Sequence, residues 1–236
     1  MVADPALLDN TQIKLAIMGK MAAGKTFAST HLVNNWGGQA WTTAERIKQI
    51  AHALIDQTGD LGQLLQVVLL DDQTVELGTL ELLRFAETYQ PEPGNKPRHL
   101  YQEVGQILRE LQPSTRCCWE EDLERRMSQA PAQFTIIDIR ARESFNYFVN
   151  QRDFYSLLIS SPEEVRRRRM QQRDLHDVSD PNLLNHVSET DVDSLQFDFE
   201  ISNSDDDPSK FYEELDQMVC QLAEKETERK VNSLNV

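Results

Sequence analysis

The sequence has only three cysteines and no long apolar run, and this composition argues against several classes of protein. Cys117 and Cys118 are adjacent and Cys220 stands alone, so the set predicts neither a disulfide framework nor a zinc site. Reduced thiols are typical of a cytoplasmic protein, which is the location we expect. No apolar stretch approaches the roughly 20 residues of a membrane span. Residues 1–12 have no basic segment followed by an apolar one, so neither a membrane partner nor a signal peptide is expected.

Basic residues are also scarce. The chain has 24 lysines and arginines against 39 acidic residues, which gives a net charge of −15. Binding to duplex nucleic acid depends on lysine and arginine contacts to phosphates, so no nucleic-acid partner is expected. A small anionic ligand remains compatible, because its site needs only a local cluster of positive charge. At 236 residues, 39% of them hydrophobic, the chain is long enough for one domain, or one domain with an insert.

The most specific motif is an eight-residue segment, Gly19 to Thr26, with the pattern G-x-x-x-x-G-K-T. It lies between a predicted buried strand at residues 13–18 and a predicted helix from Thr26 to about residue 34. In this context a P-loop holds phosphates, because backbone N–H groups point inward and a helix N-terminus adds positive charge. Lys25 of such a loop contacts the outer phosphates, and the Thr26 hydroxyl is a ligand of Mg²⁺. The motif therefore predicts an ATP site with Mg²⁺ as cofactor.

Beyond this motif, apolar runs alternate with helical patterns. Further strands are predicted at residues 39–41, 134–139, 154–159 and 197–202, and helices at about 43–53, 98–111, 119–128, 161–174 and 207–225. This alternation predicts an α/β fold with a parallel sheet of about five strands and helices on both faces, and together with the Gly19–Thr26 motif it predicts a P-loop NTPase fold. Residues 64–70 and 77–89 are apolar enough for helices but have no clear period, and 90–97 has the composition of a loop.

The strand at 134–139 brings a carboxylate to the edge where such sheets bind ligands. Asp138 lies near its carboxyl end, and open α/β sheets bind ligands outside the carboxyl ends of their strands. We therefore expect Asp138 beside the P-loop, where it would hold Mg²⁺ directly or through water. Arg140 follows on the same side of the strand and suits bidentate capture of a second phosphate. The alternative is an ordinary Asp–Arg pair at the surface.

The predicted helix at 161–174 carries five arginines in an acidic chain. Arg166, Arg169 and Arg173 are spaced so that they share one face of the helix. Phosphoryl transfer uses mobile cationic side chains to neutralise the charge that develops on the transferred group. The sequence therefore predicts a mobile, arginine-rich lid over about residues 161–190. The alternative is a solvated charged face that pairs with the glutamates at the start of the helix.

The order of these motifs resembles the nucleoside monophosphate kinases, and more closely the phage-type deoxynucleoside monophosphate kinase family. Further segments are similar to that family in the same order along the chain: residues 41–48, ending on Lys48; residues 98–105, with Arg98 and Gln102; Trp119; residues 186–189, with His186 and Glu189; and Asn203. The resemblance covers about residues 12–220. It departs from the family after Arg140, where Ala141-Arg142-Glu143 replaces Phe-Pro-Asn-Glu, and residues 56–96 match nothing in the family.

The resemblance implies an enzyme that transfers the γ-phosphate of ATP to a deoxynucleoside 5′-monophosphate, with nucleotides as its small-molecule partners. Motifs and resemblance together assign catalysis to Lys25, Asp138, Arg140, Arg169 and Arg173, and metal binding to Thr26 and Asp138. They place Gly19, Met21, Ala22, Ala23, Gly24, Lys25, Thr26, Phe27 and Asn203 at ATP. They place Lys48, Arg98, Gln102 and Arg140 at the acceptor, and Arg166, His186 and Glu189 in the lid.

This chemistry needs no general base, because an acceptor phosphate is already largely ionised at neutral pH. The sequence accordingly has no convincing Ser–His–Asp or Cys–His arrangement. On this interpretation, residues 1–236 form a single P-loop kinase domain. Its core spans about 12–55 and 98–225, residues 56–97 form an acceptor-binding insert, and 227–236 form a frayed tail.

Three other functions compete with this interpretation. A kinase for another small acceptor, such as a dephospho-CoA-like or sugar substrate, would share the P-loop and the lid. A nucleotide-dependent switch or ATPase would favour a hydrolytic glutamate beside Asp138, where Ile139 stands instead. An interaction module with a degenerate nucleotide site is disfavoured by the complete Gly24-Lys25-Thr26. A homodimer is compatible with the sequence, which leaves open the preferred base and the choice between ribo- and deoxyribonucleotides.

Overall fold

The computed structural model describes residues 4–8, 11–56, 60–90, 97–112, 117–174, 191–204 and 207–234. The chain forms two compact units. Unit 1 comprises Met1–Trp41 and Ala130–Val236, and unit 2 comprises Thr42–Gln129. Among the described residues, no helix combines the length and apolar character that crossing a bilayer requires.

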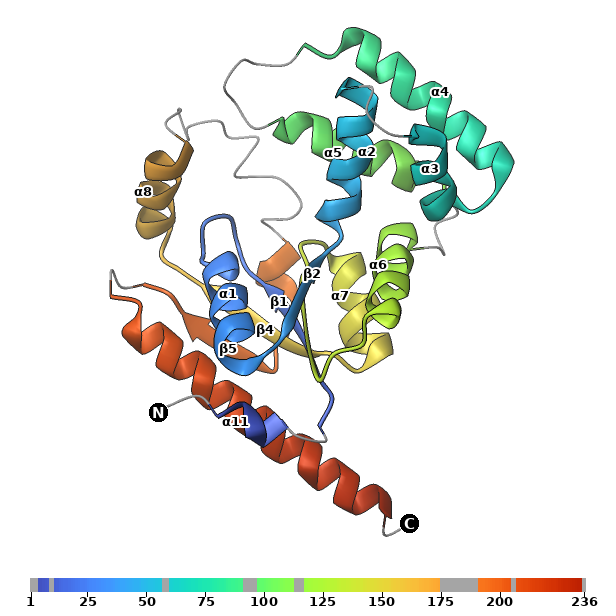
Figure 1. Cartoon of the computed structure of the whole chain (residues 1–236). Coiled ribbons are helices and arrows are strands. Elements are labelled where there is room, and N and C mark those ends of the chain that lie inside the picture. Colours follow the sequence, from blue (N-terminus) through green and yellow to red (C-terminus); the bar gives the residue numbers. More distant parts are fainter. Residues whose placement is uncertain are drawn as a thin grey trace. The chain divides into compact units, whose positions relative to one another are not determined.

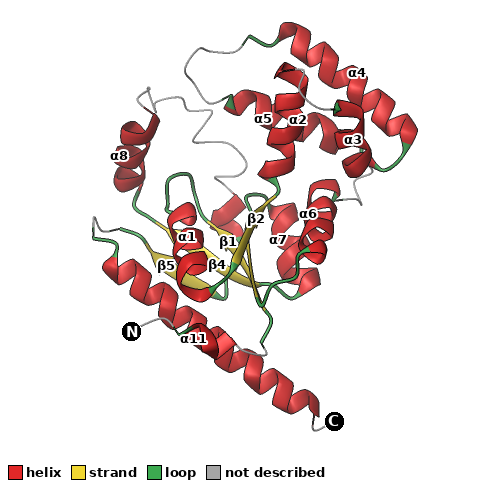
Figure 2. Ribbon diagram, viewed as in Figure 1, coloured by secondary structure: helices red, strands yellow, loops and turns green. Residues whose placement is uncertain are grey.

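Unit 1 is built on a five-stranded, all-parallel sheet flanked by helices (Figure 1, Figure 2). The strands are β1 (Ile13–Met18), β2 (Gln39–Thr42), β3 (Phe134–Asp138), β4 (Tyr155–Ser160) and β5 (Phe199–Ser202), in the order β2-β3-β1-β4-β5 across the sheet. The α/β class and the parallel five-stranded sheet are therefore confirmed, with each strand within two residues of its predicted ends. The central strand β1 is almost fully buried, which is why it reads as a continuous apolar run.

The longer helices of unit 1 are α1 (Lys25–Trp36), α8 (Glu163–Asp174) and α11 (Ser209–Leu234). A short helix, α7 (Arg142–Phe145), continues into a π-helical turn at Asn146–Asn150, and 3₁₀ turns occur at Pro5–Leu8 and Asp191–Ser194. Helices α1 and α11 share a buried polar contact, because Oδ1 of Asp216 accepts a hydrogen bond from the Trp36 indole at 2.7 Å and lies 2.8 Å from Nε2 of His31. Leu32 of α1 and Leu215 of α11, both fully buried, belong to one apolar core.

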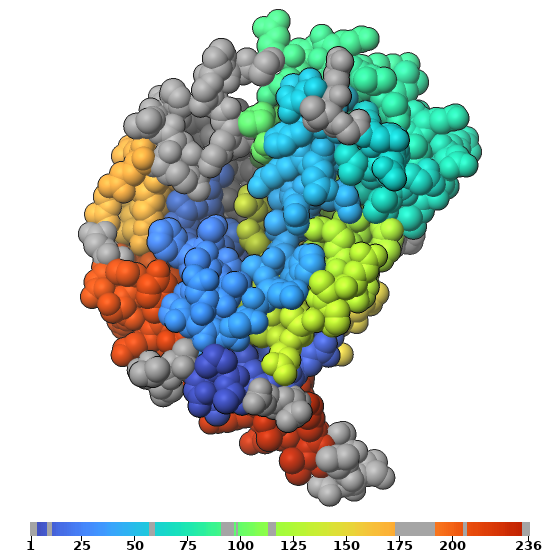
Figure 3. All heavy atoms as spheres, viewed as in Figure 1, coloured from blue at the N-terminus to red at the C-terminus, as the bar shows by residue number. Residues whose placement is uncertain are grey.

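Helix α11 continues to Leu234, whereas the sequence predicted a frayed tail from residue 227. Its last turns extend away from the other elements of unit 1 (Figure 1, Figure 3). The Tyr155 hydroxyl on β4 donates to Glu226 at 2.7 Å, and Arg229 pairs with the same carboxylate at 2.9 Å. Burial, and then the bond to Glu226, raise the pKa of Tyr155 to about 12, so the hydroxyl keeps its proton at neutral pH. These contacts, and the absence of glycine and proline, sustain the helix.

Unit 2 is helical in its described part and has an apolar core of its own. Its helices are α2 (Ala44–Asp56), α3 (Leu61–Leu69), α4 (Asp72–Thr88), α5 (Arg98–Glu110) and α6 (Cys118–Gln129). The fully buried core includes Ile50, Leu65, Leu82, Val104 and Trp119. The two segments without a clear period are confirmed as helices α3 and α4. Because α2, α5 and α6 bury their apolar faces with α3 and α4, unit 2 is wider than the insert predicted at 56–97.

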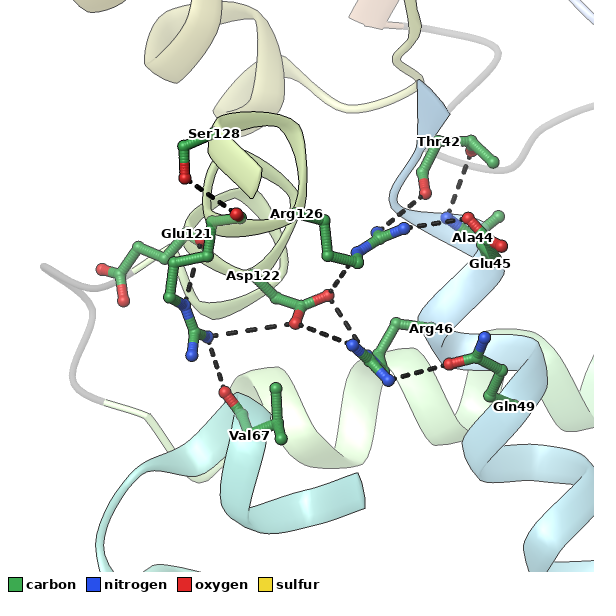
Figure 4. A network of polar contacts seen from close by, with 11 residues as sticks. Thr42, Ala44, Glu45, Arg46, Gln49, Val67, Glu121, Asp122, Arg126 and Ser128 are labelled. Atoms are coloured by element: carbon green, nitrogen blue, oxygen red, sulfur yellow. Dashed lines mark hydrogen bonds and ion pairs between the residues drawn. The ribbon is translucent and has the colours of Figure 1, made fainter. Parts of the chain in front are cut away.

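A buried carboxylate on α6 joins that helix to α2 (Figure 4). The Asp122 side chain is 1% exposed, and both of its oxygens accept hydrogen bonds from Arg46 at 3.3 Å. Arg126 donates to the same carboxylate at 3.0 Å, to Glu45 at 2.9 Å and to the Thr42 carbonyl at 3.2 Å. One acidic side chain therefore holds two arginines from different helices.

Replacing Asp122 with alanine is expected to destabilise unit 2 by about 3–5 kcal/mol, the usual result of removing one member of a buried ion pair. Arg46 and Arg126 are only 16% exposed and would remain with their charges. Urea unfolding measures the effect, and Glu110→Ala on α5, which removes an exposed carboxylate, is the control. If Asp122→Ala lowers the free energy of unfolding no more than the control does, the network contributes little to stability.

Candidate functional site

The segment Gly19 to Thr26 follows β1 at a point where the chain connections diverge. The connection after β1 leads to β2 at one edge of the sheet, whereas the connection after the neighbouring β4 leads to β5 at the other edge. Open α/β sheets bind ligands at the carboxyl ends of their strands beside such a divergence. The predicted P-loop therefore occupies the position in this sheet where a ligand site is expected.

The backbone of the loop requires both glycines of the pattern. Gly19 and Gly24 have φ angles of 158° and 115°, and Ala22 between them has a φ of 60°. A Cβ atom on Gly19 would lie 2.4 Å from the carbonyl oxygen of Ile159, and one on Gly24 would lie 2.1 Å from the amide nitrogen of Asn203. Real Cβ atoms do not approach other atoms so closely. The two glycines thus let the loop pack against β4 and against the residue that follows β5.

Lys25 is the first residue of α1 and folds back over the loop. Its Nζ lies 2.5 Å from the carbonyl oxygen of Gly19. Thr26 and Phe27 of the first turn are exposed, and Phe27 retains 66% of its surface. The first N–H groups of a helix have no acceptor within the helix. An ammonium group, an exposed hydroxyl and a helix N-terminus are therefore combined at one end of the loop.

Asp138 is the last residue of β3 and pairs in parallel register with Ile17 of β1. Its Oδ1 is buried and has no hydrogen-bond partner among the described residues. Its Oδ2 lies 3.7 Å from the guanidinium of Arg140, which is 62% exposed. A buried carboxylate oxygen without a partner costs stability, which is a feature typical of residues that hold a ligand. Oxygen ligands of this type suit Mg²⁺, and the Thr26 hydroxyl is another, so these residues fit the ion.

Two arginines of α8 bind main-chain oxygens. Arg166 is 8% exposed and donates to the Met21 carbonyl in the loop at 3.3 Å. Arg169 donates to the main-chain and side-chain oxygens of Asn203, both at 3.1 Å. The predicted shared face of these two arginines therefore points toward the loop and the end of β5.

The other face of α8 is exposed. Arg167 pairs with Glu163 at 2.7 Å, and Arg168 faces solvent. The sequence left open an alternative in which the arginines of this helix are solvated and pair with its first glutamates. Arg167 fits that alternative. For Arg173 the structure gives the helical backbone and not the side chain, and His186 and Glu189 lie outside the described residues.

Asn203 connects α8 to the loop. Its amide group donates to the Ala23 carbonyl at 2.8 Å, and its backbone N–H donates to Ser160 at the end of β4, also at 2.8 Å. The side chain is buried against Gly24. The sequence predicted that Asn203 binds ATP. That role stays a prediction, and in this structure the Asn203 amide holds the backbone of the loop.

Sequence reasoning missed two residues that touch this region. Asp193 forms an ion pair with Lys20 of the loop at 2.7 Å, and the Ser161 hydroxyl accepts a hydrogen bond from Arg169 at 3.4 Å. Asp193 lies 173 positions from Lys20 in an acidic stretch, so no local signal distinguishes it from its neighbours.

The predicted acceptor residues belong to both units. Arg140 lies in unit 1, whereas Lys48 of α2 and Arg98 and Gln102 of α5 lie in unit 2. Lys48 and Gln102 are exposed, and of Arg98 the structure describes only the backbone. Unit 1 therefore contains the loop, Asp138, Arg140 and the α8 arginines, and the remaining predicted acceptor residues lie in the other unit.

Comparisons with known proteins add little to this geometry. No family model matches the chain, and no curated protein sequence matches it significantly. Among solved structures it is similar to the crystal structure of TT1252 from Thermus thermophilus, with 13% sequence identity and a TM-score of 0.45. The match covers 96% of this chain and 100% of that one.

Proposed function

We propose that this protein is a kinase that transfers the γ-phosphate of ATP to a deoxynucleoside 5′-monophosphate. The loop from Gly19 to Thr26 carries the proposal: its G-x-x-x-x-G-K-T sequence lies between a strand and a helix, and the positive φ angles of its two glycines support a role as a phosphate cradle. The Asp-x-Arg sequence at the end of β3 and the inward arginines of α8 support phosphoryl transfer. The choice of acceptor rests on the resemblance of the motif order to the phage-type family.

The carbonyl contacts of the loop favour phosphate binding. In a planar trans peptide, the N–H of the following residue points away from the carbonyl. Because Arg166 binds the Met21 carbonyl and Asn203 binds the Ala23 carbonyl, the N–H groups of Ala22 and Gly24 point away from these side chains. Arg166 and Asn203 would thus act as positioning residues that fix the orientation of two peptide groups of the loop and leave their N–H groups available to phosphate oxygens.

On the donor side, Lys25 would exchange the Gly19 carbonyl for the outer phosphates. It would then neutralise the charge that develops during transfer. Thr26 and Asp138 would hold Mg²⁺, which when bound supplies further neutralisation of the phosphates. Because the acceptor phosphate is already ionised, the remaining task of the chain is to orient the two substrates.

A coupled assay of ADP release tests the proposal directly. Purified protein with ATP and Mg²⁺ is supplied with each ribo- and deoxyribonucleoside monophosphate in turn, and with dephospho-CoA and common sugars. We expect release that depends on at least one deoxynucleoside monophosphate. Release only with another acceptor would indicate a different kinase, and acceptor-independent release would indicate an ATPase. Release in no case would overturn the proposal.

Replacing Arg140 with alanine is expected to raise the KM of the acceptor by about 10-fold or more and to change the KM of ATP little. Its guanidinium lies 3.7 Å from Asp138 and is mostly exposed, so this pair holds it weakly and leaves it available to a phosphate. Steady-state kinetics with each substrate varied measure both constants. Arg167→Ala, which removes an exposed arginine of α8, is the control. A rise confined to the KM of ATP would contradict this role.

A further inference from the structure

The solvent-facing side of α4 is unusually apolar. Leu77, Leu80 and Leu83 retain 46%, 46% and 48% of their surface, and their spacing of three residues places them along one stripe. The opposite side of the helix, with Gly78 and Leu82, is buried in the core of unit 2. Helix α4 (residues 72–88 on the colour bar) lies at the surface in Figure 3. A continuous stripe of half-exposed leucines, unlike a single exposed one, indicates an interaction surface.

The residues of this stripe are arranged symmetrically about Leu80. Leu77 and Leu83 lie three residues before and after it, and Glu76 and Arg84 lie four residues before and after it. Consider an antiparallel pair of α4 helices with a two-fold axis at Leu80. A residue that lies a given number of positions before Leu80 in one copy is then level with the residue equally far after Leu80 in the other copy. Leu77 is then level with Leu83 of the second copy, and Glu76 with its Arg84. The stripe therefore matches itself in the positions of its leucines and is complementary to itself in charge.

Among the described residues, the ion-pair partner of Arg84 in its own chain is Glu81, and this pair is easily exchanged. Arg84 pairs with Glu81 at 2.6 Å, one turn earlier on the same helix, and the two side chains are 62% and 37% exposed. Exposed pairs of this kind contribute at most about 1 kcal/mol. Arg84 can therefore turn to Glu76 of another copy at little cost.

We propose that α4 docks against α4 of a second copy of this chain, as an antiparallel helix pair centred on Leu80. A surface that meets the same surface across a two-fold axis is the commonest arrangement in homodimers. The 17 residues of α4 form a helix about 26 Å long. One such helix per copy gives a small interface, so association is weak and depends on concentration. The proposal does not rest on the kinase assignment.

Sedimentation equilibrium of the full chain tests the docking. Over concentrations from about 5 μM to about 1 mM, which bracket weak association, the average mass should rise from 27.2 kDa toward twice that value. Leu80→Glu should weaken association at least 10-fold, because it places two carboxylates at the axis. Val231→Glu on α11, where the side chain is 53% exposed, should leave association unchanged. A wild-type chain that stays monomeric throughout this range overturns the proposal.

A charge exchange tests the antiparallel register. Glu76→Arg and Arg84→Glu should each weaken self-association at least 10-fold, because each variant puts like charges level with one another at two symmetric places. Mixed in equal amounts, the two variants should form a 1:1 dimer with affinity near that of the wild type. The double variant should associate with itself. Circular dichroism confirms that each variant is folded. If neither the mixture nor the double variant associates, the proposed pairing is wrong, even if the wild-type chain dimerises through another surface.

Discussion

Replacing Lys25 with alanine is expected to lower kcat by about 10²- to 10³-fold, or more, in a protein that remains folded. The magnitude is that of removing one preorganised group that stabilises developing charge in a transition state. Nζ of Lys25 already lies over the loop, 2.5 Å from the Gly19 carbonyl, so little reorganisation is needed before it meets a phosphate. Initial rates under saturating ATP, Mg²⁺ and acceptor give kcat, and the melting temperature checks the fold.

The same loop provides a matched control. Lys20 is also a lysine of the loop, but its ammonium pairs with Asp193, and the two side chains are 31% and 64% exposed. Lys20→Ala removes the same type of side chain and an ion pair that contributes little to stability. We expect its kcat to stay within a few-fold of the wild type. Equal activity of the folded Lys25→Ala and Lys20→Ala variants would overturn the P-loop interpretation.

The parts of this fold that the sequence predicted are those set by local pattern. β1 was predicted at both of its ends, because a buried apolar run stops at Gly19. β5 was predicted two residues too long at its start. Asp198 lies just before the strand, where its carboxylate accepts hydrogen bonds from the backbone N–H and the hydroxyl of Ser156, both at 2.8 Å. The sequence around residue 198 contains no pattern that predicts a hydrogen-bond partner 42 positions away.

Helix α7 and the π-helical turn after it were missed for a related reason. Phe145 packs edge-on against Phe197, and Phe148 packs against Phe154, with ring centroids 5.3 Å apart in each pair. These aromatic contacts hold the segment between β3 and β4. Tertiary packing of this kind overrides weak local propensity, and a short segment offers too few turns for a periodic signal.

For the candidate site, the sequence singles out residues by their chemistry but does not show what they contact. The loop, Asp138 and the α8 arginines were all singled out from their chemistry. Their partners depend on the order of strands in the sheet, which brings Arg166 to Met21 across 145 positions and Asn203 to Ala23 across 180. The bond from the Asn203 amide to the loop backbone was therefore not predicted.

Replacing Asp138 with asparagine is expected to lower kcat by about 10²-fold or more and to leave the melting temperature unchanged or higher. The first effect follows from losing a charged oxygen ligand of Mg²⁺ at the end of β3. The second follows from the structure, where Oδ1 is buried without a partner among the described residues and Oδ2 is 3.7 Å from an exposed guanidinium. An amide has nearly the same shape and is less costly to bury than a carboxylate.

Asp122→Asn in unit 2 is the contrasting control. It removes the same charge from a carboxylate that three guanidinium nitrogens contact at 3.0–3.3 Å, so stability should fall and activity per folded molecule should change little. A residue retained at a cost to stability is typical of a functional site, whereas one whose loss unfolds the protein is structural. Melting temperature and kcat, measured on both variants, separate the two roles. If Asp138→Asn loses stability and keeps its activity, Asp138 is a structural residue, and the proposed Mg²⁺ site loses its carboxylate ligand.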